Sequence, residues 1–558
     1  MRKHSATPPP HPHPADTPSG VFAPGHLGGL SHYLPVELVD DVLAESRTVQ
    51  QRLRLLPSRV GIYFMLALAL FPSLGYVRVW DKLTAGLPDG DHARPSEKAL
   101  RDLRRRVGPV PLKALFEVVA GPLGQPRTPG VSYRRWRTVA FDGCSSVKAP
   151  DQERNLNWLG RTRTRLGWAG YPMIRLMVLC ETGTRGLLGA VFGPAERGEG
   201  FYAQQLLHLL SSRTLLLADR GFDANDFLSA VADTGSQLLI RLKPRRRPAV
   251  LAVLPDGSYL TFLGPQKVRI IDAEISMTTS DGQRVSDHYR LATTLLDHRT
   301  DPATILVRLY HERWEIESAF YALRHTLAEG QVLRSADPTG LEQEVWAQLT
   351  LYQVLRAAMV DAVESVAGTD PDRASFTIAL EAARDHVVRG PGPLQDSSIG
   401  AVGRIGRAVL AGLLPKRRLR TCNRKVKAPM SRYYSRLTDP RPRTSSAIET
   451  LEFRVFQSPS AQPPPKSTAP TDGRRAGRGP GHTGEGQRNR TLQLMRTAPE
   501  ATWKSCDLAR SLGYSNIHSF RASMKRWTAE GLIRKVGRGT YKLEQAWGIA
   551  DLTDPVSR

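Results

Sequence analysis

The chain has 558 residues, of which 41% are hydrophobic, so it is long enough to build about two to four domains with sizeable cores. Lys and Arg number 78 against 53 Asp and Glu, and the formal net charge of +25 favours a polyanionic partner, most simply nucleic acid, over a membrane surface. No signal peptide opens the chain, the longest apolar run (62–71) is too short to span a bilayer, and four scattered cysteines favour a reducing cytosol over a structural zinc site.

The first part of the chain predicts a disordered arm followed by a helical domain. Residues 1–30 are rich in Pro and His, a composition typical of disorder. Apolar residues recur at helical spacing from 31 to 130, and Ser96 is expected to cap a helix with arginines at 101 and 104–106. We interpret residues 31–130 as a helical DNA-binding domain, and a solvated basic face remains the alternative.

Residues 131–244 predict the first part of an α/β core. The expected strands are 138–143, 173–181, 186–193, 213–222 and 236–243, and the expected helices are 199–212 and 224–235. Residues 245–300 then alternate and turn like an antiparallel β insertion. The core is expected to resume over residues 301–360, beginning with a strongly patterned helix.

That helix, predicted over 310–327, carries four polar residues along one edge. On a helical wheel of about 100° per residue, Tyr310, Arg313, Glu317 and Arg324 lie within one narrow arc beside the apolar stripe, where we expect them to be half-buried. The plain interpretation is an Arg313–Glu317 ion pair at four-residue spacing, worth roughly 0.2–0.5 kcal/mol. It weakens only if other carboxylates reach the same place.

Two predicted strands each end in an aspartate, Asp142 and Asp219, and such residues lie at the rim where α/β sheets build their sites. If Glu317 covers the same rim, three carboxylates converge and require cations between them. Oxygen ligands suit Mg²⁺ or Mn²⁺, and two ions about 3.5–4 Å apart support phosphoryl transfer. Tyr310, Arg313 and Arg324 would then donate to DNA phosphates beside the cut.

These residues carry a resemblance to a known family. FDG with Asp142, ADRGF with Asp219 and the motif at 310–324 resemble a DDE transposase of the IS-four insertion-sequence family. Its signature is Tyr, two residues, Arg, three residues, Glu, six residues, Lys, and the spacing holds here with Arg324 in the last place. The resemblance covers roughly residues 31–440.

The resemblance implies an RNase H-like core with a β insertion before the Glu helix, and Mg²⁺-dependent cut-and-paste transposition, in parts of the family through a hairpin intermediate. The residues that it implies are the metal ligands Asp142, Asp219 and Glu317 and the phosphate contacts Tyr310 and Arg313. Arg324 keeps the charge of the expected Lys on a wider, planar donor. We expect Arg220, directly after the second aspartate, to contact phosphate as well.

The C-terminal part lies outside the family pattern. Residues 361–455 predict a basic helical region, 456–487 a flexible Pro- and Gly-rich linker, and 488–545 a winged helix-turn-helix. The residues expected to contact DNA there are Arg521, Lys525 and Arg526 on its third helix and Arg538 in its wing. A protein-interaction domain is the alternative.

The predicted fold class is therefore α/β: an RNase H-like mixed-sheet core with a β-rich insertion, an α-helical N-terminal domain and a C-terminal winged-helix-like domain. The predicted function is a transposase that acts on double-stranded DNA, at the terminal inverted repeats of its element and at the target, as a homodimer on DNA in the bacterial cytoplasm at the nucleoid. Two alternatives stay open: a DNA-binding regulator with a retired nuclease core, and a structure-selective nuclease without strand transfer.

Overall fold

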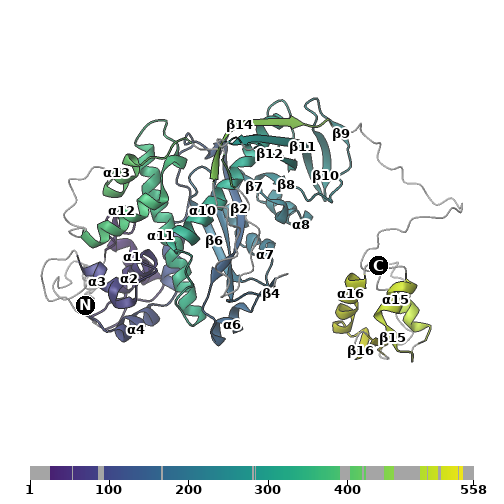
Figure 1. Ribbon diagram of the computed structural model, residues 1–558, viewed down its shortest axis with the longest axis horizontal. Coiled ribbons are helices and arrows are strands. Elements are labelled where there is room, and N and C mark those ends of the chain that lie inside the picture. The colour runs from purple at the N-terminus through teal and green to yellow at the C-terminus, as the bar shows by residue number, and fades with distance from the viewer. Residues whose placement is uncertain are drawn as a thin grey trace, which may run out of the picture. The chain divides into compact units, whose positions relative to one another are not determined.

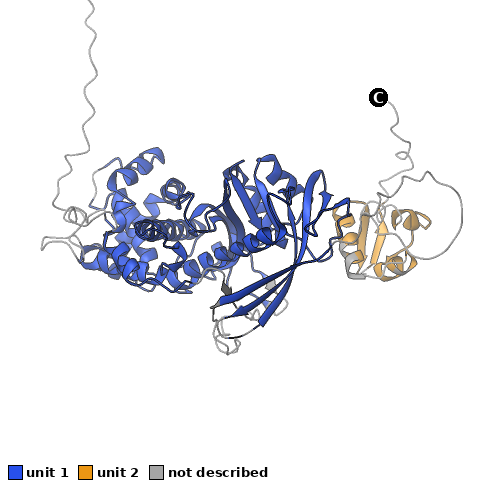
Figure 2. Cartoon of the chain, turned by 90° about the horizontal axis from the view of Figure 1, so that it is seen from above, with its two compact units in different colours: residues 1–465 blue, residues 466–558 orange. Residues whose placement is uncertain are grey.

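The computed structural model divides the chain into two compact units, residues 1–465 and 466–558 (Figure 2). Most of the predicted arm, nearly all of the predicted linker, Arg538 and much of the basic run after 414 lie outside the described residues. The structure describes residues 26–457 and 491–544, without 53–54, 86–93, 165–166, 280–281, 283, 390–402, 417–419, 423–444, 499, 513–516 and 538–539. Across these ranges, none of the helices has the length and apolar character needed to cross a membrane.

A mixed β-sheet forms the centre of the first unit. Its core strands are β2 Trp136–Lys148, β5 Met173–Glu181, β6 Leu187–Pro194, β7 Thr214–Ala218 and β8 Gln237–Arg241. They lie in the order β6-β5-β2-β7-β8. Strands β6, β2, β7 and β8 run in one direction, and β5 runs antiparallel to them. In chain order this is third, second, first, fourth, fifth, the arrangement of an RNase H-like core, so the predicted fold class is confirmed.

Both faces of this sheet are buried because each strand is apolar on both sides. Ala140 and Leu217 belong to a core shared with the long helix α11 (Pro338–Glu364), whereas Phe141 and Leu216 belong to a core shared with α7 (Glu199–Gln204) and α8 (Asn225–Asp233). The helix predicted over 199–212 is shorter than expected: it ends at Gln204, and a 3-10 turn, Leu207–Leu209, follows.

The β insertion extends the sheet beyond β8. Its strands are β9 Ala252–Val253, β10 Tyr259–Leu263, β11 Gln266–Thr279 and β12 Arg284–Thr293, all antiparallel to their partners. The prediction that residues 361–455 form a helical region is wrong at its C-terminal end. There, β14 (Ser445–Val455) pairs antiparallel with β11. Leu451, Phe453 and Val455 alternate and pack on the core, and this period-2 pattern outweighs the helical spacing before it.

Helices gather around α11 on one side of the sheet (Figure 1). The N-terminal helices are α1 Val36–Glu45, α2 Ser58–Leu70, α3 Tyr76–Thr84, α4 Glu97–Val107 and α5 Val110–Val119, and α12 Phe376–Arg389 and α13 Gly403–Ala411 follow α11. Ser96 caps α4 as expected, its hydroxyl accepting from Ala99 N at 3.2 Å.

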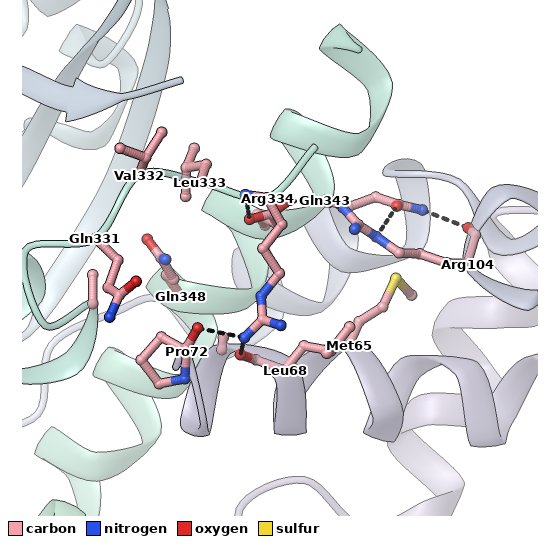
Figure 3. A pocket seen from close by; sticks show the side chains of 13 residues that line it. Met65, Leu68, Pro72, Arg104, Gln331, Val332, Leu333, Arg334, Gln343 and Gln348 are labelled. Atoms are coloured by element: carbon pink, nitrogen blue, oxygen red, sulfur yellow. Dashed lines mark hydrogen bonds and ion pairs between the residues drawn. The ribbon is translucent and has the colours of Figure 1, made fainter. Parts of the chain in front are cut away.

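Two arginines, one buried and one half-buried, join the N-terminal helices to α11 and to the segment directly before it (Figure 3). Arg104, predicted on a solvated or DNA-facing surface, is 6% exposed instead and donates from Nε to Gln343 Oε1 at 3.0 Å. Arg334 donates to the Pro72 carbonyl at 2.6 Å, at the C-terminal end of α2. Because each guanidinium replaces its water shell with protein acceptors, the interface fixes α2 and α4 against the catalytic core.

The second unit has the winged helix-turn-helix order. Residues 491–496 are helical, and α15 Ser505–Ser511 and α16 Ile517–Ala529 follow. Strands β15 Trp503–Lys504, β16 Ile533–Gly537 and β17 Thr540–Leu543 form an antiparallel sheet in the order β15-β17-β16. Phe520, Met524 and Trp527 of α16 bury into its small core, which leaves the opposite face of α16 to solvent.

Candidate active site

The strand register places the two aspartates side by side. Ala140 of β2 is paired with Leu217 of the parallel strand β7, so Asp142 and Asp219, each two residues further on, reach the same edge of the sheet. Neighbouring strands are about 4.8 Å apart. Asp142 Oδ1 accepts from Gly143 N at 2.9 Å, and Asp219 Oδ1 accepts from Gly221 N at 2.7 Å. Backbone amides thus orient both carboxylates at the rim.

The predicted helix 310–327 is continuous in the chain but changes its winding. It consists of α9 (Ala303–His311), a 3-10 turn (Glu312–Trp314), α10 (Glu315–Tyr321) and a π-helical turn (Ala322–Leu327). The single 100° wheel is therefore wrong here, because each change of winding rotates the residues that follow it.

Helix α10 lies against β2 (Figure 1) and brings Glu317 to the aspartates. The Glu317 side chain is 33% exposed, and its Oε1 lies 3.7 Å from Nη2 of Arg313. The predicted ion pair is present, and it is not isolated. Although burial lowers the pKa of the Arg313 guanidinium, the nearby Tyr310, Asp142 and Glu317 raise it above its ordinary value. Arg313 therefore lies among the acids.

The pKa of the Asp142 carboxyl reflects its burial and its charged neighbours. Burial raises the pKa of its carboxyl, Arg313 lowers it, and the like charges of Glu317 and Asp219 raise it again, to about 7. An ordinary aspartate has a pKa near 3.9. Burial is the main cause of the rise, and the two neighbouring carboxylates add to it.

Tyr310 and Arg313 are more deeply buried than the sequence predicted. Tyr310 is 2% exposed and donates its hydroxyl to the Ala218 carbonyl at 3.1 Å, and Arg313 is 5% exposed. The expectation that both are half-buried is therefore wrong. The hydrogen bond from Tyr310 holds the end of β7 directly before Asp219. The hydroxyl of Tyr310 therefore points into the protein and not to solvent.

Arg324 reaches the site from the π-helical turn. Its Nε donates to the Phe320 carbonyl at 3.2 Å, and its Nη1 donates to Ser146 Oγ. A bulge in β2 between Cys144 and Val147 turns Ser146 toward Arg324. The sequence analysis did not single out Ser146, because a bulge within an apolar strand leaves little mark in the sequence.

We predict that Arg324→Ala loses most of the activity and that Arg324→Lys keeps most of it. A charged contact to phosphate is worth about 1.5–3 kcal/mol, and a lysine keeps the charge. The measurement is the rate of DNA cleavage by the purified variants. Ser146→Ala is the control, since it removes only the internal partner of Arg324. Equal rates for the Ala and Lys variants of Arg324 would assign this residue to a solvated surface.

The other predicted contacts are exposed residues. Arg220 is exposed on the 3-10 turn that begins directly after Asp219. In the second unit, Arg521, Lys525 and Arg526 are all exposed on α16, with Arg526 Nε 3.8 Å from Glu530 Oε1.

A buried ionic cluster behind the site was missed by the sequence analysis. Arg185, in the turn between β5 and β6, donates from Nε to Glu315 Oε2 at 2.6 Å and forms an ion pair with Asp372. All three side chains are at most 5% exposed. The cluster ties the first residue of α10, two positions before Glu317, to the far end of the sheet.

The donor set of the site suits a hard divalent cation, because all three acids offer carboxylate oxygens. Among the described residues, no group of three or more His, Cys, Asp or Glu side chains is arranged so that it could hold a metal ion. Burial first, and then the charges of Glu317 and Asp219, raise the pKa of Asp142, and a nearby cation would lower it. The three acids thus have the donor chemistry that divalent metal ions prefer.

Comparison with known families and proteins matches most of the chain. Residues 24–117 match the family described as "Insertion element 4 transposase N-terminal", and residues 139–354 match "Transposase DDE domain". "Transposase InsG for insertion sequence element IS4" of Escherichia coli (strain K12) is 28% identical over 413 residues, 72% of this chain and 92% of InsG. "Putative transposase InsZ" of the same strain is 26% identical over 209 residues, 37% of this chain and 68% of InsZ.

One solved structure, a cryo-EM structure of the piggyBac transposase synaptic complex with hairpin DNA, aligns with 69% of this chain and 84% of its own chain. The two chains are 10% identical, with a TM-score of 0.35. The two family matches contain most of the N-terminal helices and all three rim acids. The chain belongs to the IS4 family of DDE transposases, which act on DNA and depend on divalent metal ions.

Proposed function

We propose that this transposase binds the ends of its own insertion sequence, cuts the DNA there and joins the freed ends to a target, with Asp142, Asp219 and Glu317 as catalytic metal ligands. The observation that carries this proposal is the geometry of the rim: the register of β2 and β7 brings Asp142 and Asp219 to one edge of the sheet, and α10, which carries Glu317, packs against β2. Burial and the charges of Glu317 and Asp219 raise the pKa of the Asp142 carboxyl, which agrees with this arrangement.

Mg²⁺ is the ion proposed for the site, with Mn²⁺ as a substitute, and two ions account best for three acids. Bound there, the ions would lower the pKa of an attacking water or 3′-hydroxyl and stabilise the leaving oxygen. The chain's own part is to hold three carboxylates at one edge. Tyr310 holds the backbone before Asp219, and Arg313 holds Glu317 through their ion pair.

Arg324, Arg220 and Arg313 are proposed to contact the DNA phosphates beside the cut. Arg220 is exposed, and Arg324 is bonded to Ser146 and the Phe320 carbonyl within the protein. Tyr310 and Arg313 are buried, so either would reach phosphate only after a local rearrangement. Planar guanidinium groups suit phosphate oxygens because they donate two parallel hydrogen bonds.

Further DNA contacts are assigned to the flanking regions. The helical N-terminal region (31–130) and the exposed face of α16 are proposed to bind the element end, with the predicted domain boundaries kept as proposals. Two ends have to be held together for joining, so we propose a homodimer on DNA. Both relatives come from a bacterium, which supports the bacterial cytoplasm at the nucleoid as the site of action.

The test is incubation of the purified protein with a labelled element end, a target plasmid and Mg²⁺. We expect cleavage at the element end and covalent joining to the plasmid, both abolished by EDTA and restored by Mg²⁺ or Mn²⁺. Cleavage without joining would indicate a nuclease, and binding without cleavage would indicate a regulator with a retired core. Either result would overturn the proposed function.

The second unit is predicted to add a tethered DNA contact. Truncation after residue 465, where the two units divide and after β14 has paired with β11, keeps the core strands together. Tethering commonly raises avidity by about 10²–10⁴-fold. The truncated chain should therefore bind DNA more weakly and with a flatter salt dependence, because it neutralises fewer phosphates. Cleavage at saturating protein should survive.

The measurement for this prediction is the DNA affinity at several salt concentrations. The double variant Arg521→Ala with Lys525→Ala should reproduce most of the loss in the full-length chain. Arg534→Ala is the matched control, because this exposed arginine lies on β16 and not on α16. An unchanged affinity and slope in the truncated chain would instead favour a protein-interaction role.

A further inference from the structure

We propose that Arg334 is a positioning residue of the transposition reaction, through which the N-terminal helices set the place of Arg324 in the active site. The inference rests on the proposed function, since it takes Arg324 as a contact to the DNA phosphates. Arg334 belongs to the connecting segment (residues 328–335), which lies between the π-helical turn that carries Arg324 and α11.

The connecting segment bonds to both groups that hold Arg324 in place. Gly330 N donates to the Arg324 carbonyl at 2.7 Å, and Leu333 N donates to the Lys148 carbonyl at 2.9 Å. Lys148 is the last residue of β2, two residues after Ser146, whose hydroxyl accepts from Arg324. The place of the segment therefore decides where Arg324 lies relative to the strand that carries Ser146.

The side chain of Arg334 anchors this segment on α2 (Figure 3). Its guanidinium donates to the carbonyls of Phe71 at 2.9 Å, Pro72 at 2.6 Å and Leu68 at 3.4 Å. These carbonyls lie at the C-terminal end of α2, where a helix leaves its last carbonyl groups without partners and favours a cation. Because one side chain serves several acceptors, the segment and the end of α2 are expected to move together.

The backbone of Arg334 is held by the start of α11. Arg334 N donates to Glu344 Oε2 at 2.8 Å, and Glu344 Oε1 accepts from Arg104 of α4 at 3.1 Å. The side chains of Glu344 and Arg104 are at most 12% exposed. A Cβ atom at Gly340 would lie 2.7 Å from Ser335 Cβ, so even a methyl group there would displace the segment. A movement of the N-terminal helices thus reaches the segment directly.

Arg384 shows what a stabilising role alone looks like. Its Nε donates to the Leu70 carbonyl at 2.8 Å, at the same end of α2, but Arg384 belongs to α12. Its contact with the connecting segment is an ion pair with the partly exposed Glu329. Arg384 and Arg334 therefore stabilise the same helix end, and Arg334 is the one that the segment itself carries.

The experiment measures cleavage by the full-length protein at saturating element-end DNA and Mg²⁺, at a temperature at which every variant is folded by circular dichroism. Arg334→Ala should cleave up to about 10²-fold more slowly, the loss that a displacement of about 1 Å can cause, with nearly unchanged affinity for the end. Arg334→Lys keeps the cation and should recover part of the rate. The matched control, Arg384→Ala, should lose stability but cleave as the unaltered protein does.

The double variant Arg324→Ala with Arg334→Ala separates positioning from a general effect on the fold. If Arg334 acts through Arg324, the double variant should cleave no more slowly than Arg324→Ala alone, because the two changes then remove one interaction. Losses that multiply would overturn the inference, and so would a normal rate for Arg334→Ala.

Arg324→Ala by itself separates this inference from the proposed function. If Arg324→Ala cleaves normally, the phosphate contact proposed for Arg324 fails, and the inference fails with it. If Arg324→Ala is slow and Arg334→Ala is not, only the inference fails. Should Arg334→Ala not fold, Gly340→Ala keeps every polar group and displaces Ser335. Normal cleavage by Gly340→Ala would equally overturn the inference.

Discussion

Glu317→Gln is expected to bind DNA nearly as the unaltered protein does and to lose cleavage completely. The amide has the same shape as the carboxylate but is a poor ligand for Mg²⁺. Asp142→Asn and Asp219→Asn should behave alike. Because the three acids act as one unit, a double variant should be no slower than either single variant.

The measurement is cleavage of a labelled element end, with binding followed separately by gel shift. Glu329→Gln is the control, an exposed glutamate after the same helix that pairs with Arg384 at 2.8 Å. It should cleave normally. Normal cleavage by Glu317→Gln would remove Glu317 from the site, and loss of DNA binding by the same variant would show that its role is structural.

Arg185→Met is expected to destabilise the fold by about 3–5 kcal/mol. The change leaves Glu315 and Asp372 buried without their shared cation, and breaking a buried pair from one side has a cost of this size. The measurement is urea unfolding followed by circular dichroism. Since Glu315 begins α10, the variant should also cleave more slowly under conditions in which it remains folded.

Arg101→Ala is the matched control for this second prediction. Its partner Glu97 is four residues earlier on α4 at 3.6 Å, and both side chains are more than half exposed, so the loss should be at most about 0.5 kcal/mol. Adding Glu315→Gln and Asp372→Asn to Arg185→Met should recover part of the stability, because no buried charge then remains unpaired. A loss below 1 kcal/mol for Arg185→Met, on the scale of an exposed pair, would mean that water reaches the cluster.

The residues that the sequence alone predicted best are the three acids. Two apolar strands ending in Asp142 and Asp219, and the spacing of the motif around Glu317, sufficed to predict both the core and the family. Local patterns carry this information because alternation and helical periodicity are set by which faces are buried. β14 carried the same signal in Leu451, Phe453 and Val455, and the helical spacing around it obscured that signal.

The tertiary structure alone decided which polar side chains face one another. Arg104 was predicted at the surface and is buried between the N-terminal helices and α11. Tyr310 and Arg313 are buried because one packs against the end of β7 and the other lies among the rim acids. Nothing in the local sequence relates Arg185 to Glu315 or to Asp372. Such contacts depend on the register of the sheet and on the packing of α10, and long-range packing fixes these only after every strand has found its neighbour.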